Sequence, residues 1–137
     1  MDEKQTHTIE IISFAYKKGK PQYHYTEERC AKIIDVRHVR NPWHVKGMRK
    51  RTGLDPEVQA YVSQCQRTRV LLASEAQIAH NLQNHWHQSI YVGCVGGKHR
   101  SVAVAELLAD RLRKDGYEIT VTHRDLPNVI DHATTTE

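Results

Sequence analysis

A strand-like run leads directly into a glycine-rich turn and a helical stretch, and this succession constrains the fold more than any other feature of the sequence. The largely apolar run Ser89-Ile90-Tyr91-Val92 precedes the turn Gly93-Cys94-Val95-Gly96-Gly97-Lys98-His99-Arg100-Ser101-Val102. Glycines let the backbone approach a ligand closely, and the first N–H groups of a helix have no partner inside the helix. Because such a place attracts anions, we predict a phosphate-type site near residues 94–101.

The pattern of apolar residues along the chain predicts a single α/β domain. Strands are predicted over residues 8–14, 31–36, 89–92 and 118–122, and helices from Asp55-Pro56 onward, over 68–85 and over 100–114. Asp55 is a favoured N-cap residue, and proline suits the first helical position. Strands separated by helices indicate a largely parallel sheet with helices on its faces. Ligands in such folds gather at the carboxyl ends of the strands.

The two longer predicted helices each have an apolar stripe that is expected to face the core. In the second helix the stripe is Leu71, Ile78 and Leu82, and in the third it is Val102, Ala105, Ala109 and Leu112. The core is expected to span about residues 8–126, with a frayed tail over 127–137. Residues 1–137 are therefore predicted to be one domain.

Length, charge and cysteine content limit the classes of function. A chain of 137 residues with 39% hydrophobic and 26% charged residues is large enough for a core without disulfides. Three cysteines without metal-ligand spacing suggest a reducing, cytoplasmic setting. We expect neither a signal peptide nor a membrane span, because the start is polar and no apolar run is long enough. The formal net charge of +4 favours anionic partners.

The sequence of the turn is similar to two known phosphate-binding loops. The nucleoside-triphosphate loop has Gly, four residues, Gly-Lys and a hydroxyl residue, but here the spacing is one residue short and His99 replaces the hydroxyl. This argues against ATP hydrolysis. Cys94, five residues, Arg100 and Ser101 match the loop of cysteine phosphatases, in which a thiolate attacks phosphorus. A cysteine-dependent phosphatase using Cys94 and Arg100 is therefore the alternative to binding alone.

A basic segment between residues 37 and 53 is the second candidate site. It is predicted to be a long irregular loop, and such loops in compact domains usually carry function. Cationic side chains and an aromatic ring could offer phosphate contacts and a stacking face to RNA. The candidates are Arg37, Arg40, Trp43, Lys46, Arg49, Lys50 and Arg51, with Tyr23 and Tyr25 nearby. The histidines, including His80, His85 and His87, lack metal-ligand spacing, so no metal site is predicted.

Four ordered motifs resemble the C-terminal domain of the RapZ (YvcJ-like) RNase adapter family. They are the turn from Gly93 to Val102; the opening segment Ile12-Ser13-Phe14-Ala15-Tyr16-Lys17-Lys18-Gly19; the loop segments Asp35-Val36-Arg37, Asn41-Pro42 and Thr52-Gly53-Leu54-Asp55; and the closing motif His123-Arg124-Asp125-Leu126. The resemblance covers about residues 8–126. One departure is Val95, which stands where the family usually has threonine.

The resemblance implies an RNA-binding domain that also holds a sugar phosphate. In that family a kinase-like nucleotide-binding domain precedes this one, and we expect the present chain to lack it, which puts ATP binding and adapter function in doubt. The positions that match the family's pocket are Gly96, Gly97, His99, Arg100 and Asn41, with His44 as a weaker match.

Other residues join the predicted ligand site by their position in this sequence. Lys98 and Arg100 oppose the helix dipole, so a bound anion would explain them, and Ser101 either caps the helix or touches phosphate. His123 and Arg124 follow a strand at the same edge. The alternatives are a hydrogen-bonded core histidine and an Arg124–Asp125 ion pair.

The leading prediction is a non-catalytic binding domain without a certain cofactor. Its ligand would be a phosphorylated sugar, a nucleotide or an RNA phosphate, held at the turn. A domain that acts only with a separate protein partner is a third alternative, and both a monomer and an oligomer remain open.

Overall fold

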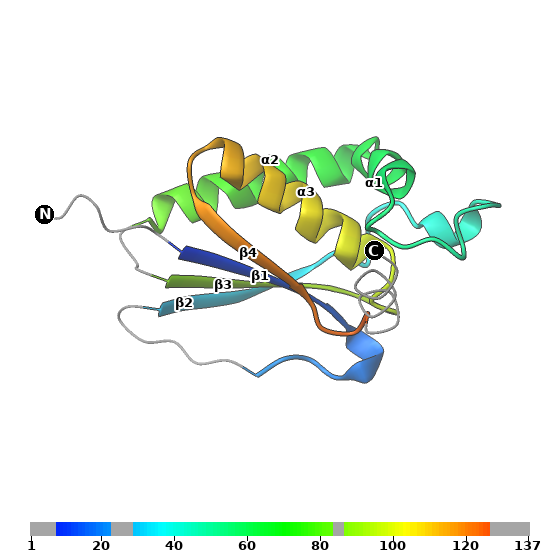
Figure 1. Ribbon diagram of the computed structural model, residues 1–137, viewed down its shortest axis with the longest axis horizontal. Helices are drawn as coiled ribbons and strands as arrows, with labels where there is room; N and C mark the ends of the chain where they lie inside the picture. Colours follow the sequence, from blue (N-terminus) through cyan, green and yellow to red (C-terminus); the bar gives the residue numbers. More distant parts are fainter. Residues whose placement is uncertain (1–7, 23–28, 84–86, 127–137) are drawn as a thin grey trace, which may run out of the picture.

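The computed structural model of the chain, which describes residues 8–22, 29–83 and 87–126, has a four-stranded sheet with three α-helices over one face (Figure 1). The elements in chain order are β1 (Thr8–Ala15), η1 (Tyr16–Lys18), β2 (Arg29–Asp35), η2 (Pro42–His44), α1 (Pro56–Ser63), α2 (Gln66–Asn81), β3 (His87–Cys94), α3 (Arg100–Lys114) and β4 (Glu118–His123). The predicted α/β class with a parallel sheet is confirmed. The predicted frayed tail lies outside the described residues.

The sheet is parallel throughout, and its strands end at one edge. The strand order is β2-β3-β1-β4. β1 runs beside β3 in a register that pairs Thr8 with His87 and Ala15 with Cys94. β4 pairs with the other side of β1 as far as Ser13 and His123. The residues that follow the four strands are therefore gathered at one end of the domain.

The core lies between the sheet and the three α-helices, with α3 contributing most of the helical residues. Ile9 and Ile11 of β1 and Ile90 of β3 are buried there. The stripe predicted for the third helix is confirmed, because Val102, Ala105, Ala109 and Leu112 are all fully buried. A fully buried valine or leucine side chain contributes about 1.5–3 kcal/mol by leaving water, so Val102 and Leu112 hold α3 firmly in place. Its N-terminus is consequently fixed relative to β1 and β3.

The stripe predicted for the second helix was wrong in its phase. Ile78 is 37% exposed and Leu71 is only partly buried against the core, whereas α2 buries Thr68, Leu72, Ala76 and Ala79. The small side chains of Ala76 and Ala79 allow the helix to approach the core closely. The start of α1 follows the prediction, because Asp55 Oδ1 accepts a hydrogen bond of 2.8 Å from the amide of Glu57.

Candidate functional site

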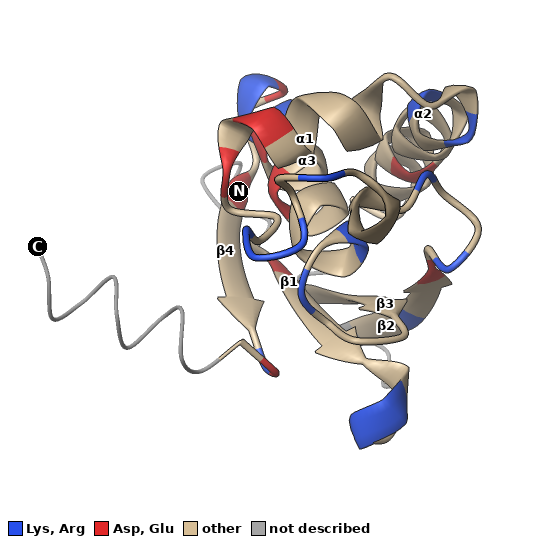
Figure 2. Ribbon diagram, turned by 90° about the vertical axis from the view of Figure 1, so that its right-hand side faces the viewer, with Lys and Arg blue, Asp and Glu red and all other residues tan. Residues whose placement is uncertain are grey.

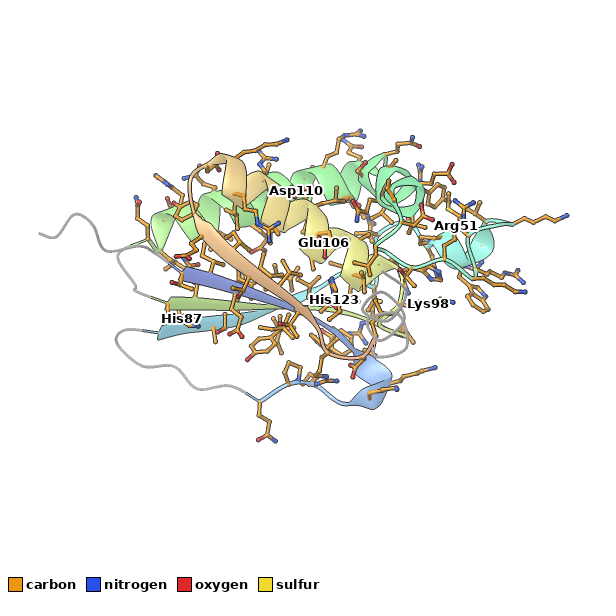
Figure 3. All side chains as sticks on the ribbon, in the orientation of Figure 1. Arg51, His87, Lys98, Glu106, Asp110 and His123 are labelled. Carbon is orange, nitrogen blue, oxygen red and sulfur yellow. The ribbon has the colours of Figure 1, made fainter. Side chains whose placement is uncertain are left out.

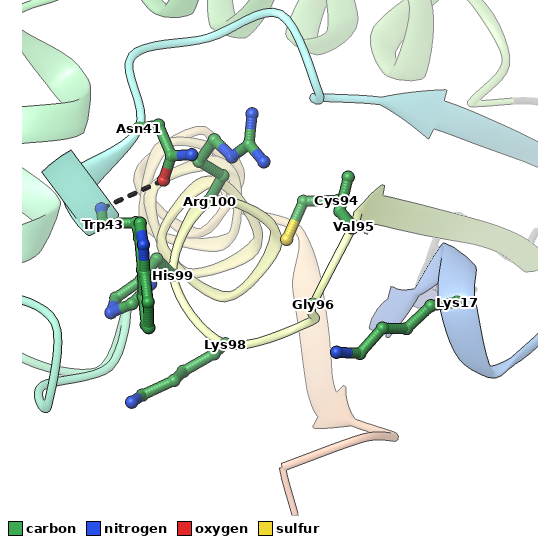
Figure 4. Close-up of a pocket in the computed structure, with 9 residues that line it drawn as sticks. All are labelled: Lys17, Asn41, Trp43, Cys94, Val95, Gly96, Lys98, His99 and Arg100. Atoms are coloured by element: carbon green, nitrogen blue, oxygen red, sulfur yellow. Dashed lines mark hydrogen bonds between the residues drawn. The ribbon is translucent and has the colours of Figure 1, made fainter.

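A crevice opens where the chain leaves β1 and β3 on opposite faces of the sheet. These two strands are neighbours, yet η1 follows β1 below the sheet whereas α3 follows β3 above it (Figure 1). Ligands of open parallel sheets bind at such divergent strand ends. The crevice has a volume of about 390 Å³. Its lining residues are Lys17, Asn41, Trp43, Cys94, Val95, Gly96, Lys98, His99 and Arg100 (Figure 4).

The backbone amides of the turn are free to bind a ligand. The turn uses its carbonyls as acceptors: Val95 O from the amide of Lys17, Lys98 O from Gly53, and His99 O from Ala103. Within the described part of the chain, no group accepts a hydrogen bond from the amides of residues 96–102. Unpaired amides at the start of a helix are the usual donors to an anion.

Two glycines make this turn possible. Gly97 has a φ of +68°, and a Cβ there would lie 2.8 Å from the Cβ of Ala15. Gly53 lies against the first turn of α3, with its amide 2.9 Å from Lys98 O. A Cβ on Gly53 would lie 2.3 Å from the backbone nitrogen of Ala103, so only glycine fits. The long loop is thereby anchored beside the crevice.

Three cations line the crevice, and no carboxylate is among its described lining residues. Lys98 Nζ donates to Arg49 O at 2.6 Å, and Arg100 Nη1 donates to Arg37 O at 2.7 Å. Lys17 is exposed on η1, and its ammonium group contacts no carboxylate of the described residues. Seen from the carboxyl end of the sheet, η1 and the loops around the N-terminus of α3 carry many of the Lys and Arg residues (Figure 2).

Trp43 forms an aromatic wall of the crevice. The tryptophan is 49% exposed and lies across the crevice from Lys17 (Figure 4). Asn41 Oδ1 accepts a hydrogen bond of 3.0 Å from the amide of Trp43 and so fixes the start of η2. The guanidinium of Arg49 lies 5.2 Å from the centre of the ring and donates to Trp43 O at 2.8 Å. The wall is therefore held by contacts within the long loop.

His99 is a structural donor at the edge of the crevice. It is only 6% exposed, and its Nε2 donates to Met48 O at 3.0 Å. Burial lowers the pKa of His99 below its ordinary 6.5, and the neighbouring charge of Lys98 acts in the same direction, while hydrogen bonds to backbone carbonyls oppose the change. The neutral imidazole therefore carries its proton on Nε2 in the folded protein.

The lowered pKa of His99 makes stability depend on pH. As pH falls below 6.5, the unfolded chain binds a proton at this residue before the folded protein does, so we expect the free energy of unfolding to decrease until pH passes the folded pKa. His99→Gln keeps a donor for Met48 O without titrating, and should show a smaller decrease in urea denaturation between pH 7.5 and 5.0. The exposed His38→Gln is the control. Equal pH dependence of His99→Gln and wild type would contradict this assignment.

Cys94 and Ser101 lie at the base of the crevice. Cys94 is 3% exposed, and its Sγ donates to Ser101 Oγ at 3.2 Å. Ser101 is fully buried, and the contact of its hydroxyl is the thiol of Cys94. Cys94 and Arg100, the two residues of the predicted phosphatase loop, both line the crevice. The thiol of Cys94, however, is almost completely buried.

Three predicted ligand contacts lie elsewhere. His44 lines a second hollow together with Lys46, Gly47, Arg49 and Lys50. His123 is a core histidine that lies between Ser13 and Glu106 (Figure 3). Arg124 forms an ion pair of 2.7 Å with Asp125. His123 is thus a hydrogen-bonded core histidine, and Arg124 forms the ion pair with Asp125 that was the alternative to a ligand contact.

The basic loop is partly neutralised by its own contacts. Arg37 forms a bidentate pair with Asp35, which lowers the pKa of that carboxyl chiefly through this hydrogen bond. Arg51 pairs with Glu57 and Asp55, and Arg40 lies over the ring of Tyr61. Lys46 and Lys50 remain exposed beside the second hollow. Tyr23 and Tyr25 lie outside the described residues.

Lys17 is the lining residue that sequence reasoning missed. It belongs to the opening motif that resembles the family but was not among the predicted ligand contacts, although the carboxyl ends of parallel strands were expected to hold the ligand. The position of Lys17 depends on the order of the strands in the sheet, because the pairing of β1 with β3 brings Lys17 to the turn. Within the described ranges, no three His, Cys, Asp or Glu side chains converge as metal ligands, and no helix there is long and apolar enough to cross a membrane.

Fold and crevice together define a small parallel α/β domain with a cationic, amide-lined site at the strand–turn–helix junction. Residues 7–127 match the family model described as the RapZ C-terminal domain, and the chain belongs to this family. The membership confirms the resemblance carried by the four motifs.

Relatives of the chain are longer proteins. It is 35% identical over 131 residues to the nucleotide-binding protein YvcJ of Bacillus subtilis, an alignment that covers 91% of this chain and 42% of the relative. A nucleotide-binding protein of Heliobacterium modesticaldum is 37% identical over 124 residues, covering 86% of this chain and 39% of the relative. The chain thus spans about two fifths of the length of these relatives.

Proposed function

We propose that this domain is a non-catalytic binding domain whose crevice holds the phosphate group of a nucleotide, a sugar phosphate or RNA. The observation that carries the proposal is the set of unpaired amides at residues 96–102, a stretch in which Gly96, Lys98, His99 and Arg100 line a crevice with three cations. A phosphate group would accept hydrogen bonds from the amides while Lys17, Lys98 and Arg100 balance its charge. The names of the curated relatives support a nucleotide-type ligand.

A titration panel tests the proposal and separates the sources of phosphate. Inorganic phosphate, glucosamine 6-phosphate, adenosine 5′-monophosphate and a short oligouridylate are each added to ¹⁵N-labelled protein. The expected result is a saturable shift of the Gly96 and Gly97 amide signals. RNA binding should weaken steeply with salt, since every neutralised phosphate releases counterions. No shift at these amides with any of the four would overturn the proposal.

A separate hydrolysis assay addresses the phosphatase alternative. Attack by the Cys94 thiolate would hydrolyse an artificial ester such as p-nitrophenyl phosphate, and Cys94→Ser would abolish the hydrolysis. Under the binding proposal, no Cys94-dependent hydrolysis occurs and Cys94→Ser binds phosphate as wild type does. The burial of Cys94 and its bond to Ser101 favour the second result.

Trp43 should distinguish a nucleotide from a sugar phosphate. Its half-exposed ring offers a stacking face at a site where the phosphate would lie at the turn. Because base stacking on an aromatic side chain contributes about 1–3 kcal/mol, Trp43→Ala should lower the affinity for adenosine 5′-monophosphate about tenfold or more. Its affinity for inorganic phosphate should change less than about twofold, and Trp43→Phe should retain nucleotide binding. Calorimetric titration measures both, and an equal loss for both ligands would contradict a stacking role.

A further inference from the structure

We propose that the closing motif His123–Leu126 is a clasp that positions Lys17 over the crevice, and that Arg124 and Asp125 are positioning residues. The inference rests on the proposed function, because it assigns Lys17 to the phosphate site. It gives the closing motif a role different from ligand contact.

Asp125 holds the residue before η1. Pairing of β4 with β1 ends at Ser13 and His123, and Asp125 Oδ2 then accepts a hydrogen bond of 2.7 Å from the amide of Ala15. The same oxygen accepts from Nε and Nη2 of Arg124, at 3.0 and 2.7 Å. Burial acts to raise the pKa of Asp125, but these hydrogen bonds keep it below its ordinary value. The side chain is therefore a charged acceptor that extends the ladder beyond the end of β4.

Arg124 holds the residue after η1. Its Nη2 donates to Gly19 O at 2.7 Å, and its guanidinium lies 5.5 Å from the centre of the Phe14 ring. The amide of Gly19 in turn closes η1 by donating to Tyr16 O at 3.0 Å. A planar fork suits this arrangement, because a single guanidinium reaches both the carboxylate and the carbonyl.

His123 and Leu126 fix the base of the clasp. The imidazole is 7% exposed and joins three elements, with Nδ1 2.7 Å from Ser13 Oγ on β1 and Nε2 2.7 Å from Glu106 Oε2 on α3. The backbone amide of Arg124 donates to Ser13 O at 3.0 Å. Leu126 is buried, and its amide lies 3.4 Å from His123 O. Arg124 and Asp125 therefore project from a rigid support.

Lys17 lies at the middle of the segment that the clasp holds at both ends. Its amide donates to Val95 O at 3.3 Å, which joins η1 to the turn, and its side chain lines the crevice. Asp125 fixes η1 on the Ala15 side and Arg124 on the Gly19 side. Nε and Nη2 of Arg124 are occupied within its own chain, and Arg124 is not among the lining residues, so Lys17 is the cation that η1 contributes to the crevice.

A double-mutant cycle tests the clasp in the full chain, with inorganic phosphate as the probe and the Gly96 and Gly97 amides as the readout. Lys17→Ala should lower the affinity for inorganic phosphate about tenfold, because a charged hydrogen bond is lost. Arg124→Lys keeps the charge but loses the fork, and should weaken phosphate about threefold to tenfold. In the Lys17→Ala background Arg124→Lys should have no further effect. Asp125→Ala should also weaken phosphate binding in the wild-type background and have no further effect in the Lys17→Ala background.

Amide hydrogen exchange provides a readout that does not need a ligand. Arg124→Lys should increase exchange at Lys17 and Gly19, whereas Glu75→Gln, which removes the Lys32–Glu75 pair between β2 and α2, should not. If phosphate does not shift the Gly96 and Gly97 amide signals of the wild-type protein, the proposed function is overturned. If Arg124→Lys leaves the exchange rate of the Lys17 amide unchanged, the clasp is overturned. An undiminished effect of Arg124→Lys in the Lys17→Ala background would also overturn it, because Arg124 would then contact the ligand itself.

Discussion

Replacing Gly53 by alanine is expected to destabilise the protein by about 3 kcal/mol, the upper end of the range for overpacking, which lowers the melting temperature by about 10 °C. The added Cβ would lie 2.3 Å from Ala103 N, 2.5 Å from His99 O and 2.8 Å from Val102 C. All three are backbone atoms of the α3 N-terminus, so no side-chain rotation can relieve the contact. Either the loop or the start of α3 has to move, and both line the crevice.

Phosphate binding should therefore fall together with stability in Gly53→Ala. Thermal denaturation and titration with inorganic phosphate measure the two effects. Gly47→Ala is a matched control, because a Cβ there meets nothing within 4 Å although its φ is +91°. The strain of that backbone conformation costs only about 1–2 kcal/mol, and the crevice is not involved. A melting temperature of Gly53→Ala equal to that of wild type would contradict the close packing of the loop on α3.

Local sequence signals predicted the elements of this fold well. α3 begins at Arg100 and ends at Lys114 as its apolar stripe and following glycine indicated, and Asp55 caps α1 as proposed. Such signals act within a few residues and need no knowledge of the rest of the chain. The phase of α2 failed because Leu71, Ile78 and Leu82 formed one apparent stripe, whereas packing selected the stripe with Ala76 and Ala79. Tertiary contacts, which the local apolar pattern does not contain, decide which face of α2 is buried.

The site was predictable only where its residues are adjacent in the sequence. The turn carries its own glycines and basic side chains, and the structure places Gly96, Lys98, His99 and Arg100 together on the crevice. Lys17 joins them through strand order, which the sequence does not display. Arg124 was predicted as a ligand contact because it follows a strand at the same edge, but a guanidinium at a strand end is equally suited to a carbonyl of its own chain.

These differences have a common physical basis. A side chain at the carboxyl end of a strand has two possible partners, a ligand or the backbone of the neighbouring connection, and its type alone does not distinguish them. His123 finds Ser13 and Glu106, and Asp125 finds the amide of Ala15. Their satisfied contacts leave the amides of the turn as the unpaired donors of the described site. Binding is thus expected where hydrogen-bonding capacity remains unused.

Reversing two charges at the crevice should abolish phosphate binding without unfolding the domain. In the double variant Lys17→Glu, Arg100→Glu, two charged hydrogen bonds of about 1.5–3 kcal/mol each are replaced by repulsion, so affinity for a phosphate ligand should fall at least about 1000-fold. Lys17 is exposed, and a glutamate at position 100 interacts favourably with the N-terminal end of the α3 dipole. The melting temperature should therefore stay within a few degrees of the wild-type value.

The matched control separates the crevice from overall charge. Arg111→Glu, Lys114→Glu changes the net charge by the same amount at the other, C-terminal end of α3, where both side chains are exposed. If the ligand is bound by the amides and cations of the crevice, this second variant should alter affinity only a few-fold, and salt should reduce that difference. If both variants weaken phosphate equally, the attraction comes from the field of the whole basic domain. The turn would then be an anchor of α3 and not a binding site.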